Sequence, residues 1–341
     1  MKKILLTAFQ LAVTIALLIW VYHDPKKLAE MRQALMHAKF EWLAAAAVAY
    51  IIVEVAAAIR WQILLKVQGI NLNLPRLSGL FLIGMFYNQF LPGGTGGDII
   101  KSYLLLKETD RKAGALLAVV FDRFIGLVAL VAITVTLVSM RFDLLAQTSE
   151  TRRYLWILLI LLGVSVASLV ASFLISGFNL FHWLPHKFPG REKLIEIAAA
   201  YHLYARHWIA TSLAFCTSVI AHLATFTTFL CAAFALRADV VVTNFFAVMP
   251  IERTISALPI SFAGVGLREK VLQTMLHQVC GVNEGVAVLI GSLSFLIMVL
   301  CCLPGGIVYF FYKPSGAVAH VKLRVMQREV ATIEHEITEK E

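Results

Sequence analysis

The segment Asn88–Asp98 reads NQFLPGGTGGD and interrupts a long apolar part of the chain. FLIGMFY precedes it and IIKSYLLL follows it, so one proline, four glycines and a carboxylate fall where a continuous buried helix would otherwise be expected. Proline and glycine disfavour helix interiors, and a carboxylate among apolar groups needs a partner or water. The segment therefore predicts a break between two helices, at a position where polar groups serve a function.

The composition decides the class of protein. Hydrophobic residues make up 60% of the 341 residues and charged residues only 15%, whereas about half of an ordinary globular domain is apolar. Apolar stretches of about 20 residues match the thickness of a bilayer core. We predict an all-α polytopic membrane protein, with a single membrane domain over 1–315 and a polar, solvated cytoplasmic helix over 316–341.

Six segments are long and apolar enough for full transmembrane helices: 4–21, 41–60, 113–140, 154–177, 208–236 and 285–312. The first resembles a signal peptide, but VYHDPKK offers no small-residue cleavage site, which favours an uncleaved span. Between the first two spans, residues 24–39 carry an amphipathic pattern that predicts a surface helix. The 178–207 loop is interpreted as an interfacial helix after a proline-rich elbow.

Two regions, 76–107 and 240–280, fit poorly as single spans because glycine-rich links break them. Each is predicted to be a re-entrant hairpin or a broken span, and the order of spans around the first is repeated around the second. This pattern predicts two inverted halves, approximately 1–140 and 154–312, as in secondary transporters whose broken helices mark the substrate site. The predicted hinge and close-approach positions are Asn88, Pro92, Gly93, Gly94, Gly96, Gly97, Pro259, Gly264 and Gly266.

The formal net charge of +9 is spread over the loops and does not gather with aromatic residues. It therefore indicates contact with anionic lipid headgroups and argues against nucleic acid as a partner. By the positive-inside rule the N- and C-termini are expected in the cytoplasm and the protein in the cell (inner, or cytoplasmic) membrane. With that topology the first hairpin enters from the cytoplasm and the second from outside.

Ionisable residues within membrane spans are functional candidates because they are costly there. Arg123 lies about 15 Å into its span at 1.5 Å per residue, and is expected either to line a substrate path or to fix helix packing through an ion pair. Its neighbour Asp122 points about 100° away on a helix, so the two are not expected to bridge. Glu54 is a candidate partner of Arg123, a pairing that the sequence alone does not decide. We interpret Arg60 with Trp61 as an interfacial anchor and His222 as a hydrogen-bonded core histidine.

Asp98 and Lys101 share one face of the first helical turn after the glycines, where unpaired N–H groups suit a phosphate. Asp98 is expected to cap that helix, to pair with Arg123 or Arg268 as Glu269 is, or to meet the amine of a cationic headgroup. The second region contributes Glu252 and Arg253 before its break and Arg268 with Glu269 after it.

Nucleotide-binding, metal-binding and hydrolase motifs are missing. Gly97 is followed by Asp98 where a P-loop needs lysine, and no HExxH or GxSxG occurs. The five cysteines are interpreted as soft packing residues. We predict no enzyme activity, no cofactor and no metal site.

Three motifs carry a family likeness: Asn88–Asp98, FDRFIGL at Phe121–Leu127, and LPISFAGVGLRE at Leu258–Glu269. They resemble the lysylphosphatidylglycerol synthase transmembrane family, a flippase-like domain, over roughly 4–315. The resemblance implies lipid translocation, with Asp98, Arg123, Arg268 and Glu269 as leading site residues. It does not imply lysyl transfer, since a separate soluble domain does that in the bifunctional relatives and this chain is expected to lack it.

The leading hypothesis is a lipid translocase that moves a phospholipid or lipid-linked headgroup between leaflets through a polar cavity between the two hairpins. The lipid partner is expected to be an anionic or aminoacylated phospholipid, or a polyprenyl- or hopanoid-type lipid. The alternatives are an accessory subunit of a lipid-modifying system, which would bind a lipid-synthesising enzyme, and a membrane-embedded lipid transferase. Homodimer formation stays open.

Overall fold

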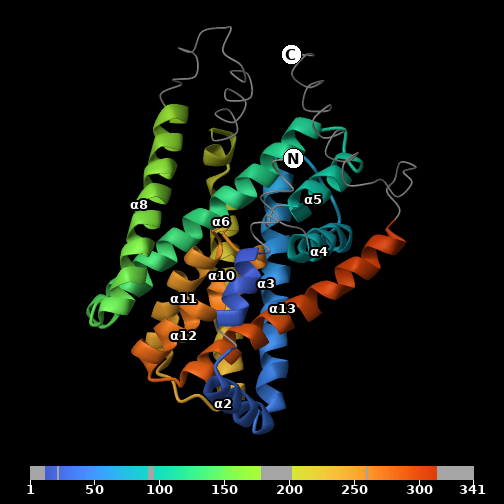
Figure 1. Ribbon diagram of the computed structural model, residues 1–341. Helices are drawn as coiled ribbons and strands as arrows, with labels where there is room; N and C mark the ends of the chain where they lie inside the picture. Colours follow the sequence, from blue (N-terminus) through green and yellow to red (C-terminus); the bar gives the residue numbers. More distant parts are fainter. Residues whose placement is uncertain (1–11, 21–22, 91–95, 178–201, 259, 313–341) are drawn as a thin grey trace.

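The computed structural model in Figure 1 describes residues 12–20, 23–90, 96–177, 202–258 and 260–312, and every regular element within these ranges is a helix. The predicted all-α class is confirmed. The first predicted span is covered only at 12–20, which is helical. The predicted tail helix and nearly all of the 178–207 loop lie outside the described residues.

Five described helices are long and apolar enough to cross a membrane: α3 (Phe40–Val67), α6 (Lys112–Met140), α8 (Ser149–Gly177), α10 (Trp208–Ala235) and α13 (Glu284–Phe311). They correspond to the last five predicted spans, and the protein is a multi-pass membrane protein. Alanines populate the buried faces of α3 and α10, and these two helices pack along each other. Small residues permit that close approach, which favours helix association where no hydrophobic effect drives it.

The second span is longer than predicted. α3 continues to Val67, seven residues beyond the expected end at residue 60, and Trp61 has no exposed surface. The interpretation of Arg60 and Trp61 as an interfacial anchor is therefore wrong. Both side chains lie inside the protein, because the apolar sequence after them carries the helix onward and packs it against its neighbours.

The predicted surface helix is present as α2 (Pro25–Met36). Asp24 caps it by accepting a hydrogen bond from the Lys26 N–H at 3.0 Å, the usual way to satisfy an orphan donor at a helix start. Two contacts fasten it to the beginning of α13: the Lys27 ammonium lies 3.0 Å from the Glu284 carboxylate, and the Glu30 carboxylate accepts from the Gly285 N–H at 3.0 Å.

Each broken region forms a helical hairpin. The first hairpin consists of α4 (Leu74–Phe90) and α5 (Gly96–Leu106). The second hairpin consists of α11 (Val242–Ser256), the short 3-10 turn η2 (Phe262–Gly264) and α12 (Leu267–Cys280). In Figure 1 the first lies at the end of the molecule where α3 ends and α6 begins, and the second at the end where α10 ends and α13 begins. The two hairpins therefore occupy opposite ends, as predicted; the symmetry of the two halves stays a prediction.

The arms of the first hairpin approach so closely that a side chain has no room between them. A Cβ on Gly97 would lie 1.8 Å from the Gly84 carbonyl oxygen and 2.7 Å from Asn88. The Asn88 side chain accepts a hydrogen bond from the Gly97 N–H at 2.8 Å, which ties the end of α4 to the start of α5. Gly97 is needed here for close approach.

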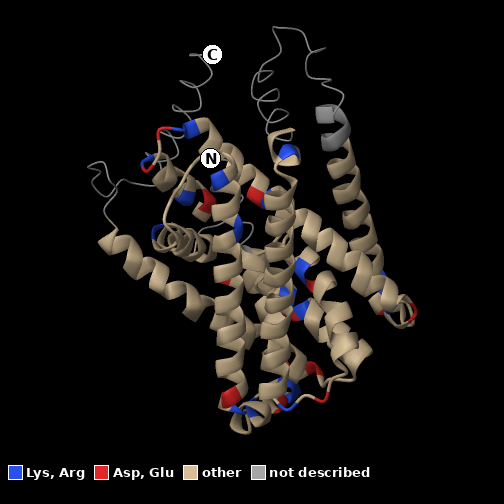
Figure 2. Cartoon of the chain, turned by 180° about the vertical axis from the view of Figure 1, so that it is seen from behind, with Lys and Arg blue, Asp and Glu red and all other residues tan. Residues whose placement is uncertain are grey.

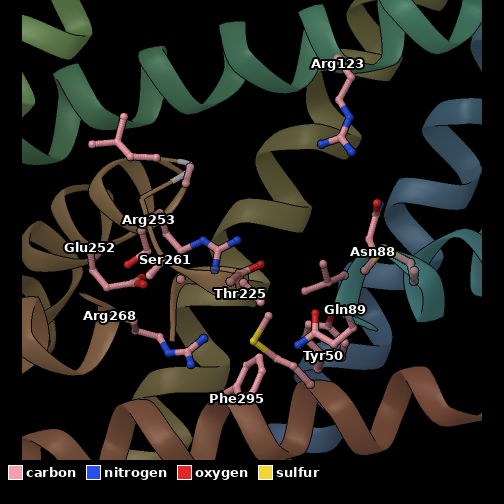
Figure 3. A pocket seen from close by; sticks show the side chains of 18 residues that line it. Tyr50, Asn88, Gln89, Arg123, Thr225, Glu252, Arg253, Ser261, Arg268 and Phe295 are labelled. Atoms are coloured by element: carbon pink, nitrogen blue, oxygen red, sulfur yellow. The ribbon is translucent and has the colours of Figure 1, made fainter. Parts of the chain in front are cut away.

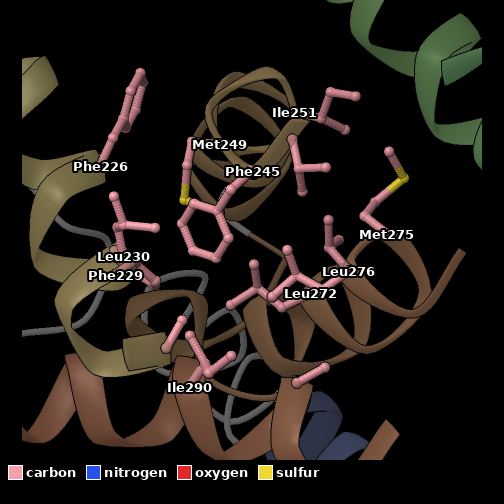
Figure 4. Close-up of a cluster of buried hydrophobic side chains, with 14 of the residues drawn as sticks. Phe226, Phe229, Leu230, Phe245, Met249, Ile251, Leu272, Met275, Leu276 and Ile290 are labelled. Atoms are coloured by element: carbon pink, nitrogen blue, oxygen red, sulfur yellow. The ribbon is translucent and has the colours of Figure 1, made fainter. Parts of the chain in front are cut away.

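The break in the second hairpin depends on backbone conformation. Gly264 and Gly266 have φ of 74° and 83°, in the region that favours glycine, and Ala263 between the arms has φ of 50°. Around this turn the hairpin is held by a large apolar cluster. Figure 4 shows side chains of α11 and α12, among them Phe245, Met249 and Leu272, packed against α10 and α13.

Charged residues collect in two kinds of place. Figure 2 shows Lys, Arg, Asp and Glu mainly at the two ends of the molecule, with tan helices between them and a further group at mid-height among the helices. The end groups suit water and lipid headgroups. The group at mid-height, where ionisable residues are costly, identifies the region to inspect for function.

Replacing Gly97 by alanine should destabilise the protein, because the added methyl group collides with backbone that cannot move away. Overpacking of this kind costs about 1–3 kcal/mol, so the midpoint of thermal unfolding in detergent should fall by several degrees. Gly163→Ala is the matched control, since nothing lies within 4 Å of its Cβ position on α8. An unfolding midpoint of Gly97→Ala equal to that of the control would contradict this packing.

Candidate functional site: a cavity between the two hairpins

A cavity of about 450 Å³ lies between the two hairpins and is lined by residues of both. Figure 3 shows the amides of Asn88 and Gln89 at its first-hairpin side, Arg253 and Arg268 reaching in from the second hairpin, and Arg123 from α6. Tyr50 of α3, Thr225 of α10, Phe295 of α13 and, from the second hairpin, Glu252 and Ser261 complete the labelled lining. Segments from both halves of the chain thus converge on one polar space.

Arg123 joins this cavity to the first hairpin. Its Nε donates to an Asp98 carboxylate oxygen at 2.8 Å, and a second guanidinium nitrogen contacts the same oxygen. The Lys101 ammonium lies 3.6 Å from the other oxygen of Asp98. The side chain of Arg123 remains 58% exposed, so part of its guanidinium is available to a ligand. The carboxylate of Asp98 therefore pairs with an arginine, which was one of the expected alternatives, and also contacts Lys101.

Behind the cavity lies a buried ion network that connects α3, α5 and α6. Arg60 donates to Asp122 at 2.7 Å and to the Ser218 hydroxyl at 3.1 Å. Lys101 lies 3.7 Å from Asp122, and its ammonium sits 4.4 Å from the centre of the Trp61 ring. Asp122 and Lys101 are each only 3% exposed. Because Asp122 faces this network and Arg123 faces the cavity, the two neighbours point apart as predicted.

The second hairpin holds its own buried pair. Arg268 donates two hydrogen bonds to one oxygen of Glu269, at 3.0 and 3.1 Å, and stacks over the Phe295 ring at 4.3 Å. The other oxygen of Glu269 accepts from the Gly266 N–H at 2.7 Å, which caps the start of α12. Arg268 lines the cavity, whereas Glu269 fixes the position of Arg268 and of the helix start.

Glu252 and Arg253, before the break, both line the cavity. The side chain of Glu252 is fully buried, and neither carboxylate oxygen makes a hydrogen bond of ordinary geometry within the described ranges. The Ser256 hydroxyl and the charges of Arg253 and Arg268 are near enough to act on it. Arg253 forms no ion pair within 4 Å among the residues that the structure describes, and its guanidinium points into the cavity.

Two sequence predictions about single residues have definite outcomes. Glu54 does not pair with Arg123; it lies beside the Cys302 thiol, which donates to it at 3.5 Å, because its helix face turns toward α13. That predicted pairing is wrong. His222 is a core histidine as predicted, and its Nε2 donates to the Gly126 carbonyl at 3.1 Å.

The hinge positions separate into four groups. Asn88 and Gly264 line the cavity, and Gly97 and Gly266 serve the packing and the backbone turn described above. Gly96 is the first residue of α5. The predictions for Pro92, Gly93, Gly94 and Pro259 fall on positions outside the described residues.

Several site residues were missed by reading the sequence. Arg60 was assigned to a membrane surface, although the apolar residues after it signal a longer helix. Gln89 follows Asn88 directly at the end of an apolar run, and that pair of amides could have been recognised. Tyr50, Thr225 and Phe295 carry no signal of their own, because apolar and hydroxyl residues are frequent in every span.

The charge of the lining favours an anion. Three guanidinium groups (Arg123, Arg253 and Arg268) face one lining carboxylate, Glu252. Arginine presents a planar fork of donors that suits phosphate oxygens, and amide and hydroxyl side chains around it can bind further oxygens. The space and the donors fit a phosphate-containing headgroup; the roles of the individual residues in binding stay predictions.

The two ion pairs of the first hairpin should differ greatly in their effect on stability. Asp122→Asn leaves Arg60 and Lys101 buried without their shared anion, which typically costs about 3–5 kcal/mol. Asp98→Asn weakens a pair whose arginine is largely exposed, for which about 0–1 kcal/mol is usual. Thermal unfolding of the two purified variants in detergent measures this difference. Equal losses, or a greater loss in Asp98→Asn, would show that the buried network does not hold α3, α5 and α6 together.

Comparison with known proteins agrees with the motifs. The profile of the family described as lysylphosphatidylglycerol synthase TM region matches residues 7–306. The chain is also 27% identical over 179 residues to UPF0104 membrane protein PH1989 of Pyrococcus horikoshii, a match that covers 52% of this chain and 49% of that protein. The matched part thus spans about half the length of that relative. Because the family profile covers most of the chain, including both hairpins and the cavity, this protein belongs to the lysylphosphatidylglycerol synthase transmembrane-region family.

Proposed function

We propose that this protein is a lipid translocase, which moves a phospholipid or lipid-linked headgroup that carries a phosphate between the two leaflets. The observation that carries the proposal is the cavity itself: hairpins from opposite ends of the molecule meet there, and it contains three arginines. The headgroup would occupy the cavity while the acyl or prenyl chains remain in the bilayer.

The hairpins supply a route for the headgroup. Irregular backbone at membrane depth is tolerated where protein or a wet cavity surrounds it, and Asn88 and Gln89, near the end of α4, and Ser256 and Gly264, at the second break, line this cavity. We propose that both are re-entrant and that small movements of their arms open the cavity to one leaflet and then to the other. Arg123 would receive the phosphate from the first hairpin's side, and Arg253 with Arg268 from the second.

The family supports a lipid as the cargo. Its description names a synthase of lysylphosphatidylglycerol, an aminoacylated phospholipid. For this chain we propose transport without lysyl transfer or other catalysis of its own, in the cytoplasmic membrane and with both termini in the cytoplasm. The substrate class is set by the phosphate, and the amine of an aminoacylated lipid would meet Asp98 or Glu252 beside the arginines.

The test is transfer of fluorescently labelled phosphatidylglycerol between leaflets of proteoliposomes, measured by chemical quenching of the outer leaflet. The double variant Arg123→Ala/Asp98→Ala removes both members of the ion pair that involves the cavity residue Arg123, and it leaves the buried Lys101 its second carboxylate partner, Asp122. Loss of a charge-assisted hydrogen bond of about 1.5–3 kcal/mol should slow transfer by about 10- to 100-fold. The control Lys27→Ala/Glu284→Ala removes a similarly exposed pair outside the cavity lining.

The other outcomes discriminate between functions. Transfer that survives the Arg123→Ala/Asp98→Ala change at the wild-type rate would overturn the role of the cavity. A chemically altered lipid without leaflet exchange would indicate a membrane-embedded transferase. If the wild-type protein gives neither result until a lipid-synthesising enzyme is added, it acts as an accessory subunit.

A further inference from the structure

Four carboxylates are buried in the described ranges: Glu54, Asp122, Glu252 and Glu269. Glu252 differs from the other three. Asp122 has Arg60 and Lys101, Glu269 has Arg268 and a backbone N–H, and Glu54 accepts from the Cys302 thiol. Glu252 alone among the four makes no hydrogen bond of ordinary geometry. Packing and capping thus explain the others but leave Glu252 without a structural role.

The position of Glu252 connects it to the cavity. It lies one turn before Ser256 on α11, and the hydroxyls of Ser256 and Ser261 are likewise buried without a hydrogen-bond partner in the described parts of the chain. All three line the cavity, and Figure 3 shows Glu252 and Ser261 close to Arg253 and Arg268. Such a group of unsatisfied polar side chains is rare in a protein interior and calls for an explanation, of which a functional role is one.

The charges around Glu252 come from its own helix and from the elements packed against it. Arg253 belongs to α11, Arg268 and Glu269 act from α12, and Arg123 of α6 lies across the cavity. On α10, His222 is near enough for the charge of Arg253 to act on it, and its ring is bound to the Gly126 carbonyl. At the start of α8, Arg152 binds the Ala146 carbonyl and Glu150 acts on Lys270. The cations around Glu252 outnumber the anions.

Binding of an anion to this cavity must change the balance between the ionised and the protonated form of Glu252. Burying an ionised carboxylate costs several kcal/mol unless it is compensated. While no anion is bound, the guanidinium groups of Arg253 and Arg268 offset this cost for Glu252. A phosphate bound to the same groups takes over that compensation and repels the carboxylate. A protonated Glu252 removes the repulsion and can donate a short hydrogen bond to a phosphate oxygen.

We propose that Glu252 is a proton-binding site that takes up one proton when an anionic lipid headgroup enters the cavity, so that proton and headgroup cross the membrane together. This rests on the proposed translocase function and adds its energy source. The proton comes from water on the side where the headgroup enters and is released with it on the other side. Linkage is reciprocal, so headgroup binding strengthens as the pH falls and weakens as the pH rises.

The test uses labelled phosphatidylglycerol in proteoliposomes with an acidic lumen and an alkaline exterior, the voltage being clamped with potassium and an ionophore. One proton per lipid should concentrate the label in the outer leaflet about tenfold for each pH unit of gradient. Because a singly charged anion and a proton move together, changing the clamped voltage should not alter this ratio. Chemical quenching of the outer leaflet measures it.

The variants assign the effect to a residue. Glu252→Gln should distribute the label evenly between the leaflets at any gradient, and Glu252→Asp should restore accumulation. Glu41→Gln, an exposed carboxylate in the first turn of α3, should accumulate label like the wild type. Monodisperse elution and an unchanged unfolding midpoint confirm that each variant is folded.

A second measurement does not depend on the transfer rate. Adding dihexanoyl phosphatidylglycerol to the purified wild-type protein should increase the infrared carbonyl stretch of a protonated carboxyl group. Glu252→Gln should lose this increase, and Glu41→Gln should keep it. If the wild-type protein equalises the label despite a pH gradient, the coupling is overturned but the translocase function is not. An infrared increase that persists in Glu252→Gln has the same consequence. A wild-type protein that moves no label overturns the translocase function, and the coupling with it.

Discussion

The ion network of Asp122 with Arg60 and Lys101 is the interaction on which the arrangement of the site depends. These three charges come from α6, α3 and α5, and they are buried where no solvent can replace a lost partner. Burying an ion away from water is costly unless it is paired. Separating these helices would break the pairs and leave buried charges without partners. The network anchors the first hairpin to two full spans and places Asp98 where it can hold Arg123.

Both hairpins are embedded in apolar clusters, and the first also makes ion pairs to α6, which bears on how it could move. The arms of the first hairpin pack against α3 and α6 in one cluster, and those of the second pack against α10 and α13 in another. The first hairpin adds a glycine approach at Gly97, the Asn88 side chain and ion pairs to Arg123 and Asp122. Dense apolar packing resists gradual deformation, whereas an ion pair can exchange one partner for another. Under the proposed function, a phosphate that competes for Arg123 would supply such an exchange.

Each arginine of the cavity has a different local environment. The side chain of Arg123 is partly exposed and paired with Asp98. Arg268 is buried and fixed by Glu269 and Phe295, and Arg253 points into the cavity. A headgroup would therefore meet one rigid cation and two that are freer to follow it. The charges of Arg253 and Arg268 both act on Glu252, so under the proposed coupling it would respond to an anion bound to them.

The sequence by itself determined the membrane class, five of the long helices and both helix breaks, and it singled out Asp98, Arg123, Arg253 and Arg268 as candidate site residues. The length and apolar composition of a segment and the position of its glycines determine helices and breaks locally. Ionisable residues are easily recognised within apolar segments. Only the tertiary structure decided which charges meet: Arg123 with Asp98 rather than Glu54, and Arg60 with Asp122 rather than the membrane surface. Ion partners more than twenty residues apart are set by how helices rotate and cross, which depends on the packing of all of them at once. For the same reason no local pattern could show that Glu252 is buried without a hydrogen bond beside the cavity.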